Sequence, residues 1–287
     1  MAKRRLMAVL AHPDDESFGP GGTLARYADE GADVHVVICT DGAAGSVIEA
    51  YADARERLAE IRRQELEGAT GVLGVQLHML GYRDSGYIGD PAGEHPEAFV
   101  NVNEEEAAAR IVHLIRSVRP QVVITHDETG GYFHPDHIKA HAVTVRAFHA
   151  AGDGDALPRA GAPYQPQRLY FTAISGRRLR LYTLSMRLRG RDPTRVGRNN
   201  DIDLTRLGRP RGELHGRINI DRYWKRKQEA SAQHESQGGG TGGFGRSLPV
   251  WLRKWLLSTE YFVRAYPSPE KGVWEDDLFA GVKIEEK

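Results

Sequence analysis

The sequence LMAVLAHPDDE, residues 6–16, joins a short apolar run to a histidine, a proline and three consecutive acids. Its apolar part, Leu6 to Ala11, has the length and composition of a buried β-strand. The three carboxylates that follow repel one another and cannot stabilise a hydrophobic core. We therefore expect a positively charged partner among them, and a bound metal cation would be such a partner.

The composition is that of an ordinary globular protein. The chain has 287 residues, of which 40% are hydrophobic and 27% are charged, and this length allows a large single domain or one domain with a sizeable appendage. Its 39 basic and 39 acidic side chains cancel, which argues against a general affinity for nucleic acid. The single cysteine, Cys39, excludes an internal disulfide and lies in the apolar run VHVVICT, which indicates a small buried side chain.

The N-terminal sequence MAKRRLMAVLAHPDD begins like a secretory signal peptide but does not continue like one. Its apolar run is only about six residues long, and acids follow at once. No stretch approaches the ~20 apolar residues of a transmembrane helix. We therefore expect a cytoplasmic protein.

Strand and helix signals alternate along the first 150 residues. After the first apolar run, further strand-like runs occupy residues 34–40, 75–80 and 121–125. Helical patterns lie between them at residues 23–30, 54–73 and 104–118, and are followed by Gly31, Gly74 and Pro120. This alternation predicts an α/β fold, with a Rossmann-like, mostly parallel sheet and helices on both faces.

The pattern loosens after a helix that starts near Pro135. We expect a connecting loop at residues 152–167 and strands at 169–174 and near 261–265. We also expect a helix at residues 223–236, a glycine loop at 238–243 and an amphipathic segment at 251–257. The segment Arg177 to Arg217 holds twelve arginines and only four acids. We expect residues 1–175 to form a catalytic core, and residues 176–287 to complete the same domain as an Arg-rich insertion and C-terminal extension.

Two clusters of histidine and acid follow two of the predicted strands. His12 and Asp15 come directly after the first strand, and HPDH, residues 134–137, follows the strand at 121–125 after a short turn. The carboxyl ends of parallel strands meet at one edge of a sheet, and the first and fourth strands are commonly neighbours where the strand order reverses. Two histidines and a carboxylate can then converge with other positions open, as in a catalytic zinc site. AHPDDE alone could equally be a helix cap, but the second cluster favours the metal site.

Together, AHPDDE and GGYFHPDH, residues 130–137, resemble the two signatures of the LmbE/PIG-L family of zinc-dependent N-deacetylases. Weaker matches are Arg62-x-x-Glu65, GYRDSG at 81–86, HESQ at 234–237 and DDLFAGV at 276–282. The resemblance extends over nearly the whole chain. It is closest to the branch that includes the deacetylase of the mycothiol pathway and the amidase of mycothiol conjugates.

The resemblance implies a role for each residue of the two signatures. The zinc ligands would be His12, Asp15 and His137. Asp14 would be the general base, and His134 would stabilise the oxyanion or act as the acid. Asp136 would tune or orient His134, and Tyr132 would be a mobile tyrosine at the site. Such a set can hydrolyse an amide, because bound zinc polarises the acyl oxygen and lowers the pKa of a bound water to about 7.

The resemblance also implies a small-molecule N-acyl amino sugar as the substrate, from which an N-acetylglucosamine unit would lose its acetyl group. Arg62 and Asp84 match residues that hold the sugar, and we assign His234 of HESQ to the same substrate-binding group. Two positions depart from the family pattern: Phe133 stands where many relatives have glycine, and His126 where tyrosine is frequent.

Four alternatives remain open. The first is an amidase acting on a thiol-sugar conjugate. The second is a non-haem iron enzyme, because two histidines and a carboxylate also suit Fe²⁺. The third, a dinucleotide-binding enzyme, is disfavoured because residues 19–22, GPGG, lack the G-x-G-x-x-G spacing and the nearby acids would repel a pyrophosphate. The fourth is an anionic-surface binding protein that uses the Arg-rich segment and PVWLRKWLL, residues 249–257, although we expect its tryptophans to lie in the core.

Overall fold

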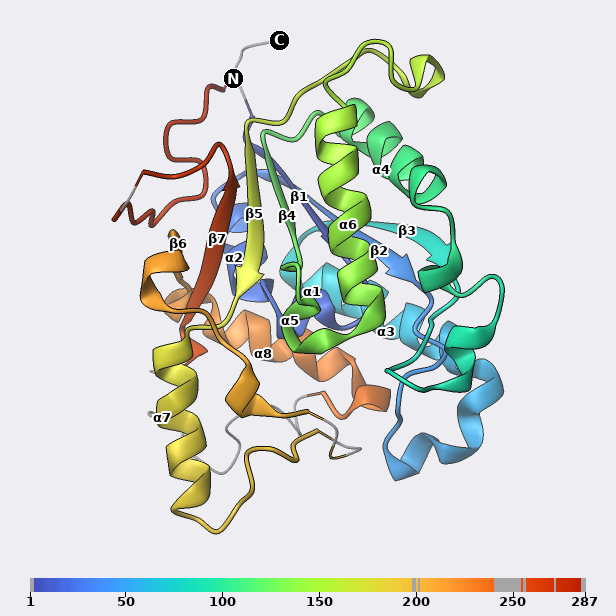
Figure 1. Ribbon diagram of the computed structural model, residues 1–287, viewed down its shortest axis with the longest axis vertical. Coiled ribbons are helices and arrows are strands. Elements are labelled where there is room, and N and C mark those ends of the chain that lie inside the picture. Colours follow the sequence, from blue (N-terminus) through green and yellow to red (C-terminus); the bar gives the residue numbers. More distant parts are fainter. Residues whose placement is uncertain are drawn as a thin grey trace.

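The structure, a computed structural model, describes residues 3–197, 200, 202–239, 254, 257–270 and 272–284. Within these residues a seven-stranded sheet forms the centre of the molecule, in the order β3-β2-β1-β4-β5-β7-β6 (Figure 1). The strands are β1 Arg5–Leu10, β2 Asp33–Thr40, β3 Gln76–Tyr82, β4 Val122–Thr125, β5 Arg168–Ala173, β6 Gly216–Asn219 and β7 Thr259–Tyr266. Strands β1 to β5 run parallel to one another, whereas β7 runs antiparallel to both β5 and β6.

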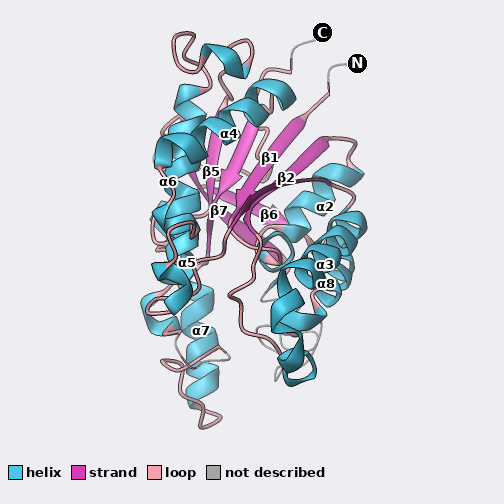
Figure 2. Ribbon diagram, turned by 90° about the vertical axis from the view of Figure 1, so that its right-hand side faces the viewer, coloured by secondary structure: helices cyan, strands magenta, loops and turns pink. Residues whose placement is uncertain are grey.

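Helices cover both faces of this sheet, as Figure 2 shows. One face carries α2 Gly21–Asp29, α3 Leu58–Leu73 and α8 Trp224–Gln233, and the other carries α4 Glu104–Val118 and α6 Pro135–Ala150. Alternate residues of β1 serve the two layers, because Leu6 and Leu10 pack in the first core and Met7 and Val9 in the second. The predicted α/β, Rossmann-like architecture is thereby confirmed.

The Arg-rich segment contains regular structure that its composition concealed. Helix α7, Gly176–Arg187, buries Leu179, Tyr182 and Met186 on one side, and strand β6 extends the sheet beyond β7. The helix predicted at residues 54–73 begins only at Leu58, because residues 49–57 form 3₁₀ turns. The predicted glycine loop from residue 240 onward, and residues 251–257 except 254 and 257, lie outside the described residues.

The glycines that follow β1 serve packing. A Cβ on Gly22 would lie 2.3 Å from Ile220 Cδ1, so only glycine lets α2 approach the segment after β6 so closely. Gly22 therefore serves the packing of α2. Among the described residues, no helix is long and apolar enough to cross a membrane.

Glu260 of β7 joins the C-terminal part of the sheet to the helix that follows the AHPDDE loop. Its carboxylate accepts the N–H groups of Gly22 and Thr23 at 3.0 and 2.8 Å, and Lys227 Nζ of α8 lies 2.6 Å away. A buried anion therefore sits at the positive end of α2.

Glu260→Ala should lower the free energy of unfolding by about 1–3 kcal/mol, because it leaves the two buried N–H groups without their acceptor and Lys227 without its anionic partner. Urea unfolding measures the change. Glu30→Ala, which removes exposed ion pairs with Arg26 and Arg4, is the control and should cost less than about 1 kcal/mol. Equal losses in the two variants would contradict a capping role for Glu260.

Candidate metal centre and active site

The three acids of AHPDDE meet three different partners. Asp14 Oδ2 lies 3.1 Å from Arg62 Nη2, Asp15 Oδ1 lies 3.4 Å from His137 Nε2, and Glu16 Oε1 lies 2.7 Å from His234 Nε2. Only the second acid faces the histidine cluster. The protein itself therefore supplies part of the expected positive charge, since Arg62 faces Asp14 and His234 faces Glu16.

The three predicted metal ligands converge at the carboxyl ends of β1 and β4. These strands are neighbours, with Ala8 paired to Ile124. His12 Nδ1 lies 3.1 Å from His137 Nε2 and 3.7 Å from Asp15 Oδ2. Ligand atoms about 2.1 Å from a tetrahedral zinc ion are about 3.4 Å apart. The donor types and their spacing therefore fit zinc, and the same donors also suit Fe²⁺.

More residues surround this point than the sequence predicted. The described residues contain three overlapping groups with metal-ligand spacing, namely His12–His134–His137, Asp15–His126–His137 and His12–Asp84–Asp136. His126 had been noted only as a departure from the family pattern. Its ring stacks on His137 at 3.9 Å, and its Nε2 lies 3.4 Å from Asp15 Oδ2. Its position directly after β4, at the sheet edge that carries His12, was the available signal.

Charge is distributed unevenly within the cluster. Burial lowers the pKa of His12, but Asp84, Asp136 and Asp15 outweigh burial and raise this pKa well above its usual value. Burial raises the pKa of Asp15, but the neighbouring histidines, led by His137, hold it well below its usual range. The surroundings of His12 thus favour a positive charge, whether a proton or a metal ion supplies it.

Asp136 does not orient His134 through its carboxylate, as the resemblance had implied. Asp136 Oδ2 lies 3.2 Å from His12 Nε2 and accepts the Ser85 N–H at 2.9 Å. Its backbone N–H instead donates to His134 Nδ1 at 3.2 Å. The Asp136 side chain is fully buried, and its carboxylate contacts His12, one of the proposed metal ligands.

His134 is held as a neutral ring. Burial, followed by the charge of His12, lowers the pKa of His134 to about 3. Since Nδ1 accepts a hydrogen bond from the Asp136 amide, the proton of the neutral imidazole lies on Nε2. His134 can therefore act as a neutral N–H donor.

Comparison with known proteins identifies this arrangement. The profile described as "PIG-L: GlcNAc-PI de-N-acetylase" matches residues 7–148. A deacetylase of 1D-myo-inositol 2-acetamido-2-deoxy-alpha-D-glucopyranoside from Thermobifida fusca is 39% identical over 98% of this chain and all of its own length. The chain belongs to the PIG-L family.

This PIG-L family member is also similar to an amidase and to a deacetylase of known structure. The mycothiol S-conjugate amidase of Streptomyces coelicolor is 37% identical over 97% of each chain. The solved structure of N,N'-diacetylchitobiose deacetylase from Pyrococcus horikoshii has a TM-score of 0.61 and 18% identity, covering 93% of this chain and 87% of that one. At this identity the structural likeness supports the fold, whereas the amidase shows that close relatives differ in the amide they cleave.

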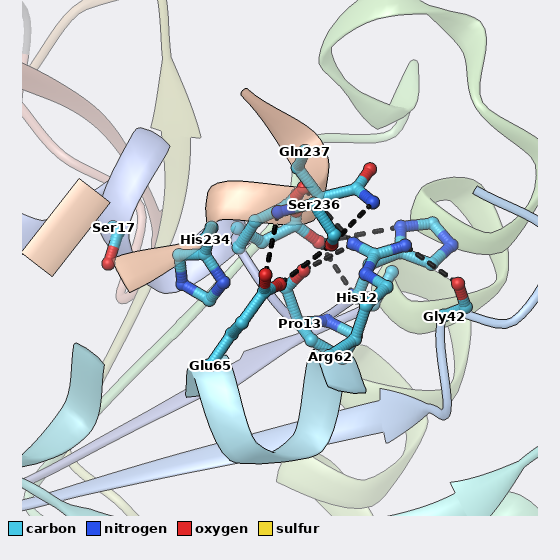
Figure 3. Close-up of polar contacts among 12 residues, drawn as sticks. His12, Pro13, Ser17, Gly42, Arg62, Glu65, His234, Ser236 and Gln237 are labelled. Atoms are coloured by element: carbon cyan, nitrogen blue, oxygen red, sulfur yellow. Dashed lines mark hydrogen bonds and ion pairs between the residues drawn. The ribbon is translucent and has the colours of Figure 1, made fainter. Parts of the chain in front are cut away.

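Arg62 and Asp84, the PIG-L residues assigned to the sugar, border the cluster. Arg62 is only 2% exposed, so it is not a surface charge. It donates to the carbonyl oxygens of Gly42 and Pro13 (Figure 3). It also donates to the Asp14 carboxylate. Asp84 Oδ1 accepts the Gly86 N–H at 2.9 Å, as a turn-forming residue does, and also lies 3.5 Å from His12 Nε2. Their predicted contact with sugar hydroxyls stays a prediction.

His234, unlike Arg62 and Asp84, does not border the histidine cluster. Its side chain has no exposed surface, and Glu16 lies between it and the AHPDDE backbone. Burial lowers the pKa of His234, but the adjacent Glu16 carboxylate outweighs burial and raises it. The expectation that His234 binds substrate is corrected, because a wholly buried ring cannot contact a sugar.

Tyr132 lies on a strained turn next to the histidines. Its ring is 5.0 Å from His137 and 5.7 Å from His134. The turn is the short helix α5, Gly130–Phe133, in which Phe133 has a positive φ of 68°. Such a φ is unfavourable for a side chain with a Cβ, which explains why glycine is the easier residue at this position. A cavity of about 800 Å³ adjoins this turn.

Asp15→Ala should abolish tight metal binding, because it removes the only carboxylate among the three proposed ligands. The fall in affinity should exceed the about 10–100-fold that substitution of an outer-shell partner costs. Metal content after dialysis and competitive titration measures it.

His126→Phe distinguishes the alternative ligand sets. If His12, Asp15 and His137 hold the metal, this variant should keep one ion per chain, with at most the outer-shell loss of about 10–100-fold in affinity. Loss of metal from His126→Phe equal to that from Asp15→Ala would show instead that Asp15, His126 and His137 are the ligands.

Proposed function

We propose that this protein is a zinc-dependent hydrolase that removes the N-acetyl group from a small-molecule substrate containing N-acetylglucosamine. The observation that carries the proposal is the convergence of His12, Asp15 and His137 beside Asp14, at the edge where β1 and β4 end. Nearly full-length similarity to a deacetylase of such a substrate supports it. Zinc, when bound, would polarise the acyl oxygen and lower the pKa of a water to about 7. The cytoplasmic location stays a prediction.

Asp14 is the proposed general base. Its side chain is 17% exposed, unlike that of Glu16, and it is adjacent in sequence to the ligand Asp15. Arg62 Nη2 lies 3.1 Å from the Asp14 carboxylate. Burial raises the pKa of Asp14 more than the charge of Arg62 lowers it, so this pKa rises to about 6. The carboxylate can take a proton from the attacking water and deliver it to the departing amine.

His134 is the proposed oxyanion stabiliser. The Asp136 amide occupies Nδ1, so the protonated Nε2 is available to donate a hydrogen bond. A fixed donor aimed at the oxygen that becomes negative stabilises the transition state more than the ground state. Tyr132 and Asp84 border the same space and complete the proposed site together with Arg62.

Asp14→Asn should lower kcat by roughly 10²–10⁴-fold, the usual contribution of general acid–base catalysis, while one metal ion stays bound. The substitution preserves shape and leaves the three ligands untouched. Release of amine from an N-acetylglucosamine derivative measures turnover, and metal analysis of the same sample gives the control. Near-normal turnover in the metal-loaded variant would remove Asp14 from the mechanism.

A second candidate function is hydrolysis of a larger amide in a thiol-sugar conjugate, and the cavity beside the Tyr132 turn favours it. Its volume of about 800 Å³ is in the range of pockets that enclose whole ligands, much more than an acetyl group fills. Its walls come from the loop after β3, from the turn and from the Arg-rich segment, and include Tyr87, Ile88, Phe133, Ile202, Arg206 and Leu207. A substrate with a bulky apolar substituent therefore has room next to the site.

Leu207→Trp separates the two functions by filling this cavity. It should leave hydrolysis of a simple N-acetylglucosamine derivative within about two-fold and lower kcat/KM for a bulky thiol-sugar conjugate by about ten-fold or more, a loss of at least about 1.4 kcal/mol of transition-state binding. Leu188→Trp, at an exposed position of the same segment, is the control. Equal losses for both substrates would show that the cavity does not discriminate between them.

A further inference from the structure

Asp14 has a backbone conformation that amino acids with a side chain rarely adopt. Its φ is 128° and its ψ is −25°, outside the regions allowed for a residue with a Cβ. Such a conformation persists only where surrounding contacts enforce it. Its carbonyl accepts the N–H groups of Ser17 and Phe18, at the start of the short helix α1, Asp15–Phe18. Its own N–H donates to Glu16 Oε2 at 3.0 Å.

Glu16 is therefore one of the contacts that fix the Asp14 backbone, and it is itself fixed from the far end of the chain. Its side chain has no exposed surface. Oε1 accepts the Ser17 hydroxyl at 2.6 Å and lies 2.7 Å from His234 Nε2, which is 218 residues away in the sequence. A buried carboxylate without such partners would be strongly destabilised.

The segment that carries His234 is docked on α3, the helix that also carries Arg62. Ser236 donates from its N–H and its hydroxyl to the Glu65 carboxylate, at 2.6 and 2.7 Å (Figure 3). Arg62, one turn earlier on α3, holds the Asp14 carboxylate at 3.1 Å. The backbone and the side chain of Asp14 are thus held from two directions that converge on the same helix.

We infer that Glu16 and His234 are positioning residues, which hold Asp14 in its strained conformation so that its carboxylate is directed at the reacting water. This inference rests on the proposed role of Asp14 as general base. His234 has no exposed surface and belongs to none of the groups of described residues with metal-ligand spacing, so it acts through Glu16. A residue outside the segment that matches the family profile therefore completes the catalytic geometry.

The first test replaces His234 by leucine, which fills the space but cannot donate to Glu16. A shift of about 1 Å in a catalytic group can cost on the order of 100-fold in rate. We expect kcat to fall by about 10- to 100-fold while KM and metal content change little. His234→Gln, which restores an N–H donor, should recover most of the loss. An unchanged kcat in His234→Leu would overturn the inference.

A double-mutant cycle separates positioning from a general loss of structure. In the Asp14→Asn background the base is absent, so His234→Leu should lower the residual kcat by no more than about two-fold. An undiminished loss in that background would show that His234 does not act through Asp14, and would overturn the inference. If His234→Leu fails to fold, Glu16→Gln, which keeps the side-chain volume, takes its place in the same cycle.

Tyr27→Phe is the matched control. Tyr27 is also fully buried and joins the N-terminal part to the C-terminal segment, through hydrogen bonds with Asp277 and Leu278 at 2.8 and 2.6 Å. Its loss should reduce stability while kcat stays within about two-fold. Failure of the proposed function is distinguishable, because the zinc-loaded wild-type protein would then release no amine, and failure of the general-base role would appear as full activity of Asp14→Asn. Failure of this inference alone leaves Asp14→Asn inactive and His234→Leu active.

Discussion

The parallel pairing of β1 with β4 is the constraint on which the site depends. Its register, Leu6 to Val122 and Ala8 to Ile124, makes both strands end at the same edge of the sheet. Histidines 125 residues apart in the sequence, His12 and His137, thereby come within 3.1 Å of each other. A parallel sheet buried on both faces resists a change of register, because a shift by one residue would move every β1 side chain to the opposite core. The proposed metal ligands are therefore held in place by strands whose register is fixed.

Burial of charge is the second constraint, and the C-terminal half of the chain satisfies much of it. His234 meets Glu16, and Lys227 meets Glu260 at the start of α2. Arg209 of the Arg-rich segment lies 3.0 Å from Asp127, whose other oxygen accepts the Gly131 N–H in the turn that carries Tyr132. The C-terminal strands and helices therefore do more than extend the sheet, because they fix the loops at its catalytic edge.

The sequence predicted those features that leave a local signal. Alternating apolar runs revealed β1 to β5, and the two HPD clusters, placed at strand ends, predicted that His12, Asp15 and His137 meet. Pairings between distant buried polar residues leave no periodic signal, so the Glu16–His234 contact was missed and His234 was assigned to the substrate instead. The arginines of α7 similarly obscured its apolar face, formed by Leu179, Tyr182 and Met186. Asp136 was linked to the wrong histidine because sequence proximity does not say where a carboxylate points.

We propose that a metal held by His12, Asp15 and His137 allows this chain to cleave the acetamide of an amino sugar. The most direct measurement follows acetate and free amine released from an N-acetylglucosaminyl-inositol by chelator-treated protein, before and after addition of one equivalent of zinc. We expect no release before zinc is added, and release of acetate and amine in equal amounts afterwards. Equal hydrolysis with and without zinc, or none in the zinc-loaded protein, would contradict it.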